Sequence, residues 1–232
     1  MNIFSDATKL PLFPSDNKKA MMRYILFFIG LSFVISCEKD ENLSQPELYP
    51  DEYHYYSGGS KIYLKHSLNK VWIEFEQSGI TGEMAKTILA DYSFLNTDNL
   101  SDSLYYDRFI AIINESSDCT GFKNYLKELN RNNEIYSATP VFYTSDNCLD
   151  SYWILLSEVL TENNNELISE SDFISYAETL NLELIESKYS TQHFKVIEVE
   201  TGFEALEIAN QFFESGKVHY SHPNFIAKIE LH

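Results

Sequence analysis

Candidates for catalytic chemistry in this 232-residue chain are its six histidines and its many serine and aspartate side chains. Hydrolysis by a serine nucleophile needs that serine, a histidine base and an aspartate that orients the histidine. The chain has only eight glycines, and the glycine-rich setting that usually frames such a nucleophile is absent from the sequence. The sequence therefore predicts no catalytic residue and no enzymatic activity.

Metal and cofactor chemistry is the next question. His219 and His222 lie three residues apart in a β-rich segment. On a strand, side chains three apart point to opposite faces, so we expect no metal shared between them. The sequence also lacks a phosphate-binding loop and a dinucleotide fingerprint. We therefore predict no metal site and no cofactor.

The composition is that of a globular protein, with 44% hydrophobic and 22% charged residues. Its length allows one large domain or two small ones. The formal net charge is −18. Binding to nucleic acid or to anionic lipid needs clustered lysine and arginine, so the charge argues against both kinds of partner.

A membrane anchor is expected near the N-terminus. Positive charge at Lys18, Lys19 and Arg23 precedes an apolar run over 24–35 that has no charged residue. That run is too short to span a bilayer, which takes about 20 residues, but it suits the hydrophobic region of a secretory signal. A small residue directly before Cys37 resembles the bacterial lipobox. The resemblance implies that Cys37 is acylated and becomes the mature N-terminus.

Processing at Cys37 would remove residues 1–36 and leave a net charge of about −20. The acyl chains would then provide the membrane attachment. The acidic residues 38–41 resemble the surface-export signals of Bacteroidetes lipoproteins, and their alternative interpretation is a solvated tether. We expect a lipid-anchored protein of the cell envelope at the outer membrane, with the leaflet left open.

Cys119 and Cys148 remain after acylation of Cys37. An exported compartment permits a disulfide between them. The predicted topology brings both cysteines to the same end of one folding unit. Two buried thiols are the alternative, and the sequence leaves both open.

An internal repeat of about 80 residues organises the rest of the chain. Thr120-Gly121-Phe122 recurs as Thr201-Gly202-Phe203 at an offset of 81, Trp72 and Trp153 share that offset, and Pro140 and Pro223 are offset by 83. Three matches in the same order favour a duplicated unit.

Each copy is predicted to run strand, helix, strand, strand, helix, strand. In the first copy the strands are 71–75, 95–104, 109–113 and 135–143, and the helical stripes are Met84, Ile88, Tyr92 and Phe122, Leu126, Leu129. In the second copy the strands are 153–160, 182–189, 194–200 and 218–229, and the stripes are Phe173, Ala177, Leu180 and Ala205, Ala209, Phe212. The segment 95–104 is a poor strand candidate because it is rich in Asn, Asp and Ser.

Local signals refine the ends of these elements. Thr201 and Glu204 fit a capping box at the start of the last helix, and Gly216 fits a left-handed stop at its end. Residues 59–64 are expected to form a short extra hairpin. The fold class is therefore α+β, with two tandem ferredoxin-like βαββαβ units whose antiparallel sheets carry helices on one face. The predicted domains are an upstream extension of doubtful origin (1–20), a lipoprotein signal peptide (21–37), an acidic tether (38–56), a first unit (57–148) and a second unit (149–232).

A family resemblance arises at the C-terminal end. Residues 204–226, EALEIANQFFESGKVHYSHPNFI, resemble the end of the N-terminal prodomain of subtilisin-like serine proteases, where a helix, a glycine turn and a strand lead to a Pro-Asn-Phe motif. Here His222 precedes that motif, where glutamate is commoner. Residues 55–64 are similar to the start of prodomains on Bacteroidetes subtilases, so the resemblance spans roughly residues 53–230.

The resemblance implies a non-catalytic folding chaperone and inhibitor of a subtilisin-like protease. In that family the outer face of the prodomain sheet packs on two helices of the enzyme, and the following segment enters the active-site cleft. The implied protease-contact residues are His219, Tyr220, His222, Pro223, Asn224 and Phe225. The chain stops at His232, so we expect either action in trans or a fragment of a longer protease precursor. The alternative is a cell-surface binding module or adhesin that keeps the prodomain fold without a protease partner.

Overall fold

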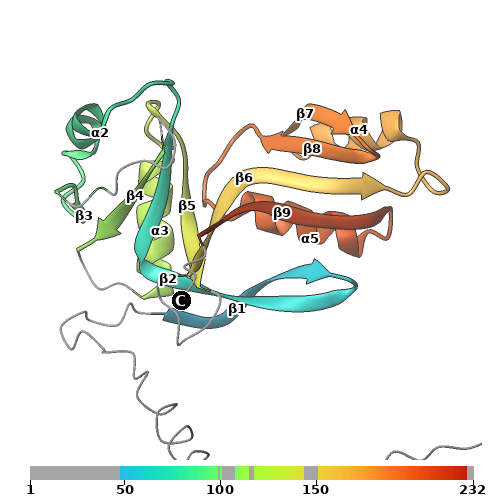
Figure 1. Cartoon of the computed structure of the whole chain (residues 1–232), viewed down its shortest axis with the longest axis horizontal. Helices are drawn as coiled ribbons and strands as arrows, with labels where there is room; N and C mark the ends of the chain where they lie inside the picture. Colours follow the sequence, from blue (N-terminus) through green and yellow to red (C-terminus); the bar gives the residue numbers. More distant parts are fainter. Residues whose placement is uncertain (1–47, 99, 101–107, 115–117, 144–150, 229–232) are drawn as a thin grey trace, which may run out of the picture. The chain divides into compact units, whose positions relative to one another are not determined.

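The structure is a computed structural model that describes residues 48–98, 100, 108–114, 118–143 and 151–228. All of them fall within one unit, residues 45–232. The described residues form four α-helices and nine strands, and the strands join into a single antiparallel sheet (Figure 1). The predicted α+β class is confirmed. The signal segment, Cys37 and Cys148 lie outside the described residues, and so do the upstream extension and the acidic residues 38–41.

The elements fall into two halves that follow one another along the chain. The first half holds β1 (Leu48–Ser57), β2 (Ser60–Phe75), α2 (Gly82–Leu89), β3 (Leu95–Asn96), β4 (Arg108–Ile113), α3 (Cys119–Leu129) and β5 (Ile135–Tyr143). The second half holds β6 (Tyr152–Asn163), α4 (Glu170–Glu178), β7 (Leu182–Lys188), β8 (Thr191–Val196), α5 (Glu204–Glu214) and β9 (Val218–Lys228).

The strands of each half are ordered alike. The first half runs β3-β4-β2-β5 across the sheet, with β1 added to β2, and the second half runs β7-β8-β6-β9. The two halves meet where β5 pairs with β6, from Val141 opposite Ile154 to Tyr143 opposite Tyr152. Beyond that short ladder, β6 pairs with β8 instead, so the sheet changes partner in the middle of β6.

The helical stripes predicted for α3, α4 and α5 are buried against the sheet. The stripe predicted for α2 is wrong, because Met84 is 43% exposed, Tyr92 lies beyond the helix, and the buried residues of α2 are Ala85 and Leu89. Phe122, Leu126 and Leu129 of α3 are fully buried, as are Phe173 and Ala177 of α4. Spacings of three and four residues place these side chains on one helical face, and burying each Phe or Leu contributes about 2 kcal/mol. The same spacing buries Ala205, Ala209 and Phe212 of α5.

Two predictions at the ends of α5 fared differently. Gly216 has a φ of 70° and follows the C-cap Ser215, which confirms the left-handed stop. The capping box is wrong in detail, because the N-cap is Phe203 and it makes no side-chain cap bond. Glu204 instead accepts hydrogen bonds from the backbone N–H and the hydroxyl of Thr201, at 2.6 and 2.7 Å. It therefore stabilises the turn before the helix.

Some strands differ from their predicted spans. β3, predicted over 95–104, is only Leu95–Asn96. β8, predicted over 194–200, starts three residues earlier at Thr191 and ends at Val196. The alternation of buried Gln192, Phe194 and Val196 with half-buried neighbours carries that strand. The alternation begins at Thr191, before Phe194, where the predicted strand began.

The N-terminal hairpin is much longer than the predicted 59–64. β1 and β2 pair from Leu48 opposite Ser67 to Ser57 opposite Ser60, with a turn at Gly58 and Gly59. β1 thus occupies residues 48–56, which the sequence assigned to the acidic tether. The prolines that suggested a tether do not exclude a strand there, because β1 is paired on one side only and its register shifts between Tyr49 and Tyr53, around Pro50.

The apolar side chains form two clusters, one on each face of the sheet. The larger cluster packs the helices against the sheet. The smaller one lies on the opposite, helix-free face and consists of Trp72, Ile110, Val141, Tyr143, Tyr152, Ile154 and Leu156, with Ile226 packed against it. Trp72 and Trp153, which marked the repeat, face opposite sides, because Trp153 packs with the larger cluster. The two halves therefore share the order of their elements but not every side-chain environment.

Side chains hold the two halves together where β5 and β8 diverge. The Asn130 amide donates to the carbonyls of Ala138 and Glu200 at 3.0 and 3.3 Å, and its oxygen accepts from the Ala138 N–H. The Tyr136 hydroxyl donates to the carbonyl of Val196 at 2.7 Å. These bonds replace the backbone ladder that is missing between the two strands.

Candidate functional site

The six residues implied as protease contacts all lie in β9, an edge strand that pairs only with β6. A strand points alternate side chains to opposite faces. Tyr220, His222 and Asn224 belong to the helix-free face, whereas Pro223 is buried and Phe225 packs with the helix-side cluster. The structure thus brings the predicted residues together but divides them between two surfaces.

His219 stands apart from this alternation. Val218 is opposite Asn163 and Tyr220 is opposite Glu162, so His219 has no partner residue on β6. Its side chain is exposed beside the turn that leads out of α5. His219 and His222 are therefore not paired, and among the residues that the structure describes no group of three or more His, Cys, Asp or Glu side chains could hold a metal ion.

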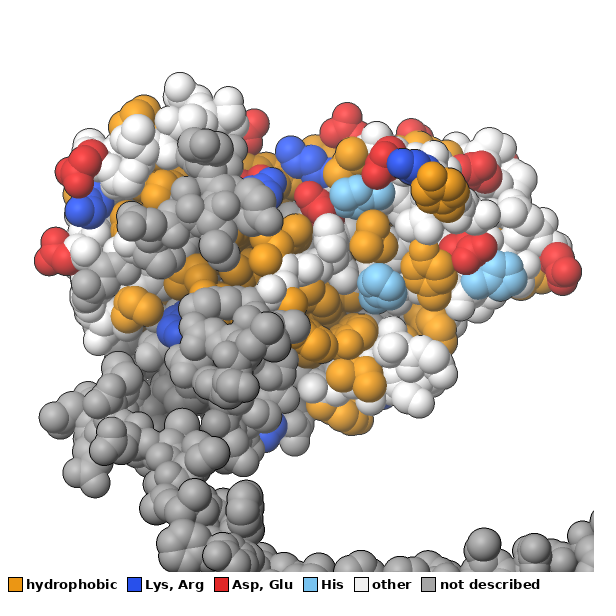
Figure 2. Space-filling view, viewed as in Figure 1, with side chains coloured by type: hydrophobic (Ala, Val, Ile, Leu, Met, Phe, Trp, Pro, Cys, Tyr) orange, Lys and Arg blue, Asp and Glu red, His pale blue; other side chains and the backbone are white. Residues whose placement is uncertain are grey.

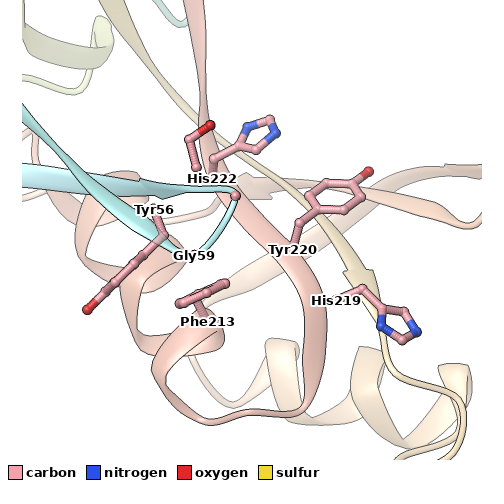
Figure 3. Close-up of a pocket in the computed structure, with 8 residues that line it drawn as sticks. Tyr56, Gly59, Phe213, His219, Tyr220 and His222 are labelled. Atoms are coloured by element: carbon pink, nitrogen blue, oxygen red, sulfur yellow. The ribbon is translucent and has the colours of Figure 1, made fainter.

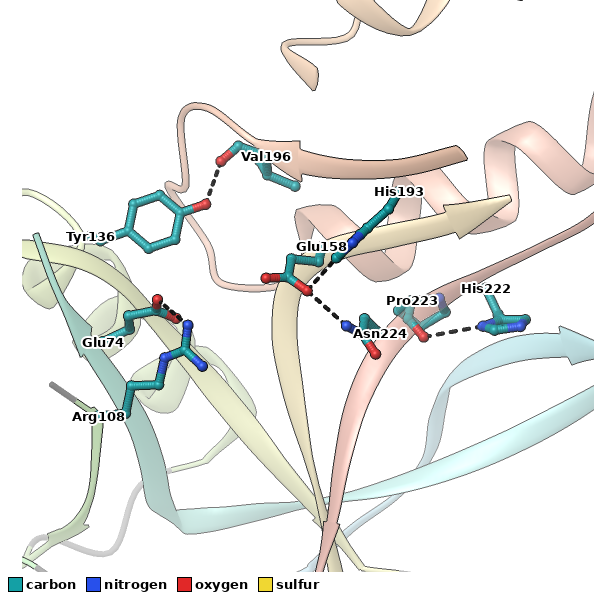
Figure 4. A network of polar contacts seen from close by, with 9 residues as sticks. All are labelled: Glu74, Arg108, Tyr136, Glu158, His193, Val196, His222, Pro223 and Asn224. Carbon is teal, nitrogen blue, oxygen red and sulfur yellow. Dashed lines mark hydrogen bonds and ion pairs between the residues drawn. The ribbon is translucent and has the colours of Figure 1, made fainter. Parts of the chain in front are cut away.

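A carboxylate on β6 connects the three strands around the motif (Figure 4). Glu158 Oε2 accepts hydrogen bonds from Nε2 of His193 on β8 at 2.8 Å and from Nδ2 of Asn224 on β9 at 2.7 Å. Glu158 lies in a bulge of β6. Leu155 is opposite Phe225 and Val159 is opposite Pro223, so β6 has more residues than β9 between these two pairs. The bulge turns the carboxylate to a position between its two donors.

The side chains of Glu158 and His193 are both 21% exposed, so their hydrogen bond is largely shielded from water. The arrangement fixes the orientation of the Asn224 amide.

The aromatic part of the helix-free surface is equally well positioned. The ring of Tyr220 stacks on that of His222, with centroids 5.4 Å apart and planes at 22°. The Tyr220 hydroxyl reaches across β6 to Thr191 Oγ1 on β8, at 2.5 Å. Side chains held in one rotamer lose little entropy when a partner covers them. Figure 2 shows histidine and hydrophobic side chains gathered over this part of the sheet.

On the other surface of β9, Phe225 anchors the strand. Its ring lies 5.5 Å from that of Trp153, 5.6 Å from that of Tyr55 and 6.3 Å from that of Phe142. Pro223 fits an edge strand because it has no N–H to donate to a neighbour. These two residues of the motif therefore serve the fold.

Two hollows lie between the β1–β2 hairpin and β9, and Figure 3 shows the first of them. One, of about 480 Å³, is lined by Tyr56, Ser57, Gly58, Gly59, Phe213, His219, Tyr220 and His222. The other, of about 460 Å³, is lined by Tyr55, Ser57, Trp153, Leu160, His222, Pro223, Asn224, Phe225 and Ala227. Tyr, Trp and Phe side chains contribute to both linings and would give a ligand large apolar surfaces to contact.

The remaining predicted site residues are the cysteines. Cys119 is the first residue of α3, and its buried Sγ lies 3.9 Å from Nε2 of His66. Cys148 and Cys37 are outside the described residues, so the disulfide and the acylation stay predictions. No described helix is both long enough and apolar enough to cross a membrane.

Comparisons with known proteins were made at three levels. No protein-family model, no curated protein and no solved structure matches the chain.

Proposed function

We propose that this protein is a non-catalytic envelope lipoprotein that binds a subtilisin-like protease in the manner of a prodomain, as folding chaperone or inhibitor. It would act in trans or as the N-terminal part of a protease precursor. The observation that carries the proposal is the helix-free surface of the second half. There Tyr220 bonds to Thr191 on β8, Asn224 bonds to Glu158 on β6, and His222 stacks on Tyr220.

The strand order supports two tandem ferredoxin-like units within this proposal. Numbered within each half, without β1, the strands run 2-3-1-4 across the sheet in both halves. All neighbours are antiparallel, and each half has a helix after its first and third strand. This is the arrangement of a βαββαβ unit with its helices on one face, which leaves the other face for a partner.

The test is to mix the full chain with subtilisin-like proteases from the same cell and to measure binding, refolding yield and residual proteolytic activity. His222→Asp places a charge on the proposed surface, where docking would bury it without a partner. We expect it to weaken binding about tenfold or more, as substitutions at the centre of an interface do.

The matched control is Ser175→Asp, which introduces the same charge on the exposed side of α4, on the opposite face of the sheet. It should bind like the unsubstituted protein. Equal loss of binding in both variants would contradict docking through the helix-free surface. If no protease is bound, refolded or inhibited, the prodomain function is wrong.

One observation favours the alternative, a surface binding module or adhesin without a protease partner. The hairpin that forms one wall of the two aromatic-lined hollows adds β1 to the βαββαβ plan of the first half. Binding of another envelope or extracellular molecule that is lost on Tyr56→Ala, by a protein that neither binds, refolds nor inhibits a subtilisin-like protease, would support this function over the first.

A further inference from the structure

The turn between β7 and β8 has a backbone conformation that its residues do not favour. Lys188 is opposite Thr191, so Tyr189 and Ser190 alone form the turn. Their φ angles are 53° and 66°. A two-residue hairpin turn with two positive φ angles favours Asn and Gly, because a bulky side chain crowds the backbone in that conformation. A tyrosine at the first position therefore strains the turn.

Another two-residue hairpin turn of the same chain provides the comparison. In the β1–β2 hairpin Ser57 is opposite Ser60, and the turn residues Gly58 and Gly59 have φ angles of 54° and 81°. Glycine adopts such angles without strain, since it has no Cβ. Both turns thus need a positive φ at two successive residues. The β7–β8 turn meets this need with a tyrosine, so the reason for the tyrosine lies elsewhere than in the turn.

The side chain of Tyr189 contributes little to the fold. It is 90% exposed, the most exposed of the large hydrophobic residues that the structure describes. Lys188 Nζ lies over its ring, 5.1 Å from the ring centroid. A cation–π contact at an exposed site is weak, and this one covers a single face of the ring. The other face and the ring edge are open at the tip of the hairpin.

The turn continues the helix-free surface of the second half. Thr191, directly after the turn, bonds through its hydroxyl to the hydroxyl of Tyr220 on β9. Tyr220 in turn stacks on His222. Figure 1 shows the β7–β8 turn at the end of the sheet where β6 ends and β9 begins. A partner that covers Tyr220 and His222 therefore meets the turn at the edge of the same surface.

We propose that Tyr189 is a docking anchor, whose ring enters an apolar pocket of a folded protein that binds the helix-free surface. The protruding tip suits a concave pocket, and the net charge of −18 argues against anionic lipid as the occupant. A short turn is already ordered, so docking it costs little conformational entropy. Buried tyrosines supply much of the affinity of many interfaces. The inference rests on the proposed function in one respect, that a protein docks on this surface.

Tyr189→Asn in the full chain separates a role in docking from a role in the fold. Asn accepts a positive φ more readily than Tyr, so the midpoint of urea unfolding should rise by about 0.3 M. Binding to a subtilisin-like protease that the unsubstituted chain binds should weaken about tenfold or more. Tyr63→Asn changes another exposed tyrosine, on β2, and should bind like the unsubstituted chain. A lower midpoint for Tyr189→Asn would show that the ring stabilises the fold, which overturns the proposal.

A photo-crosslink tests the anchor without assuming which protein binds. A benzophenone-bearing phenylalanine at position 189 keeps an aromatic ring at the tip of the hairpin. Irradiation of cells that make the full chain should give one discrete protein adduct, which mass spectrometry identifies. The same probe at position 63, where the native tyrosine is 57% exposed, should give none. No adduct from position 189, or the same adduct from both positions, would overturn the proposal.

The two experiments also separate this inference from the proposed function. An adduct at position 189 with a protein that is not a subtilisin-like protease supports the anchor and contradicts the proposed function. A protease whose binding is weakened by His222→Asp and not by Tyr189→Asn supports the proposed function and overturns the anchor.

Discussion

Gly202 offers a sharp test of how the two halves are joined. It lies in the turn before α5 with a φ of 78°, and a Cβ added there would overlap the backbone carbonyl oxygen of Ala138 in β5. Gly216 has nearly the same backbone conformation, with a φ of 70°, but nothing lies within 4 Å of its Cβ position. Both glycines thus have a positive φ, but only Gly202 also lies too close to another backbone segment to accept a Cβ.

The expected magnitudes follow from that difference. Holding an alanine in the left-handed region costs about 1 kcal/mol, so Gly216→Ala should lower the free energy of unfolding by about 1 kcal/mol. Gly202→Ala adds a clash with backbone that cannot rotate away, and overpacking of this kind costs about 2 kcal/mol more. We expect a total loss of about 3 kcal/mol for Gly202→Ala.

Urea unfolding of both variants, followed by tryptophan fluorescence and circular dichroism, gives the comparison. With a slope of about 2 kcal/mol per M, the midpoints should fall by about 0.5 M for Gly216→Ala and about 1.5 M for Gly202→Ala. The slopes should not change. Equal shifts of the two midpoints would refute the close approach of the turn to β5. Both variants would then pay only for holding an alanine at a positive φ.

Three further predictions concern the anchor, the cysteines and the junction. A fatty-acid probe should label the wild-type chain in cells and not Cys37→Ala; equal labelling of both would reject the lipid anchor. A Cys119–Cys148 disulfide should stabilise the protein by about 3 kcal/mol, and alkylation of both cysteines without reduction would exclude it. Burial and the nearby acidic residues raise the pKa of Tyr136 well above 10. The free energy of unfolding should therefore decline above pH 10, where the tyrosine ionises in the unfolded chain. Tyr136→Phe should make that decline less steep, and near neutral pH it should cost about 1 kcal/mol because the hydrogen bond to Val196 is lost. Denaturant titrations at several pH values measure both effects.

Local patterns predicted the buried faces of α3, α4 and α5 because side chains three and four residues apart lie on one face of a helix, whereas the stripe chosen for α2 was wrong. Phe122, Leu126 and Leu129 define α3 from the sequence alone, and Gly216 marks the end of α5 by its own conformational freedom. β5 is predicted over its full span of Ile135–Tyr143. Each of these signals lies within the element that it describes.

The sequence was less informative where pairing decides the structure. β1 looked like a tether because of Pro50 and the acidic residues beside it, yet β2 pairs with it on both sides of the irregularity between Tyr49 and Tyr53. Leu95–Asn96 is a strand only because Ile112 and Ile113 of β4 lie opposite. Neither strand carries enough local preference to be assigned without its neighbour.

The core of the candidate site was also out of reach of sequence reasoning. Glu158 is separated from His193 by 35 positions and from Asn224 by 66, and nothing local distinguishes it from the other acidic residues. The only signal was indirect. A motif resemblance pointed to Asn224, and its side chain needed a fixed acceptor somewhere in the fold.

The alternation of β9 changes how substitutions in the motif should be interpreted. Phe225 belongs to an aromatic group with Trp153 and Tyr55, so its loss would weaken the fold and the hairpin attachment before it affected any partner. His222 lies on the helix-free face and stacks only on Tyr220 among the aromatic contacts, so its loss leaves the core intact. A binding defect from Phe225→Ala is therefore weak support for a direct contact, whereas the same defect from His222→Asp in a stably folded protein identifies the surface that meets the partner.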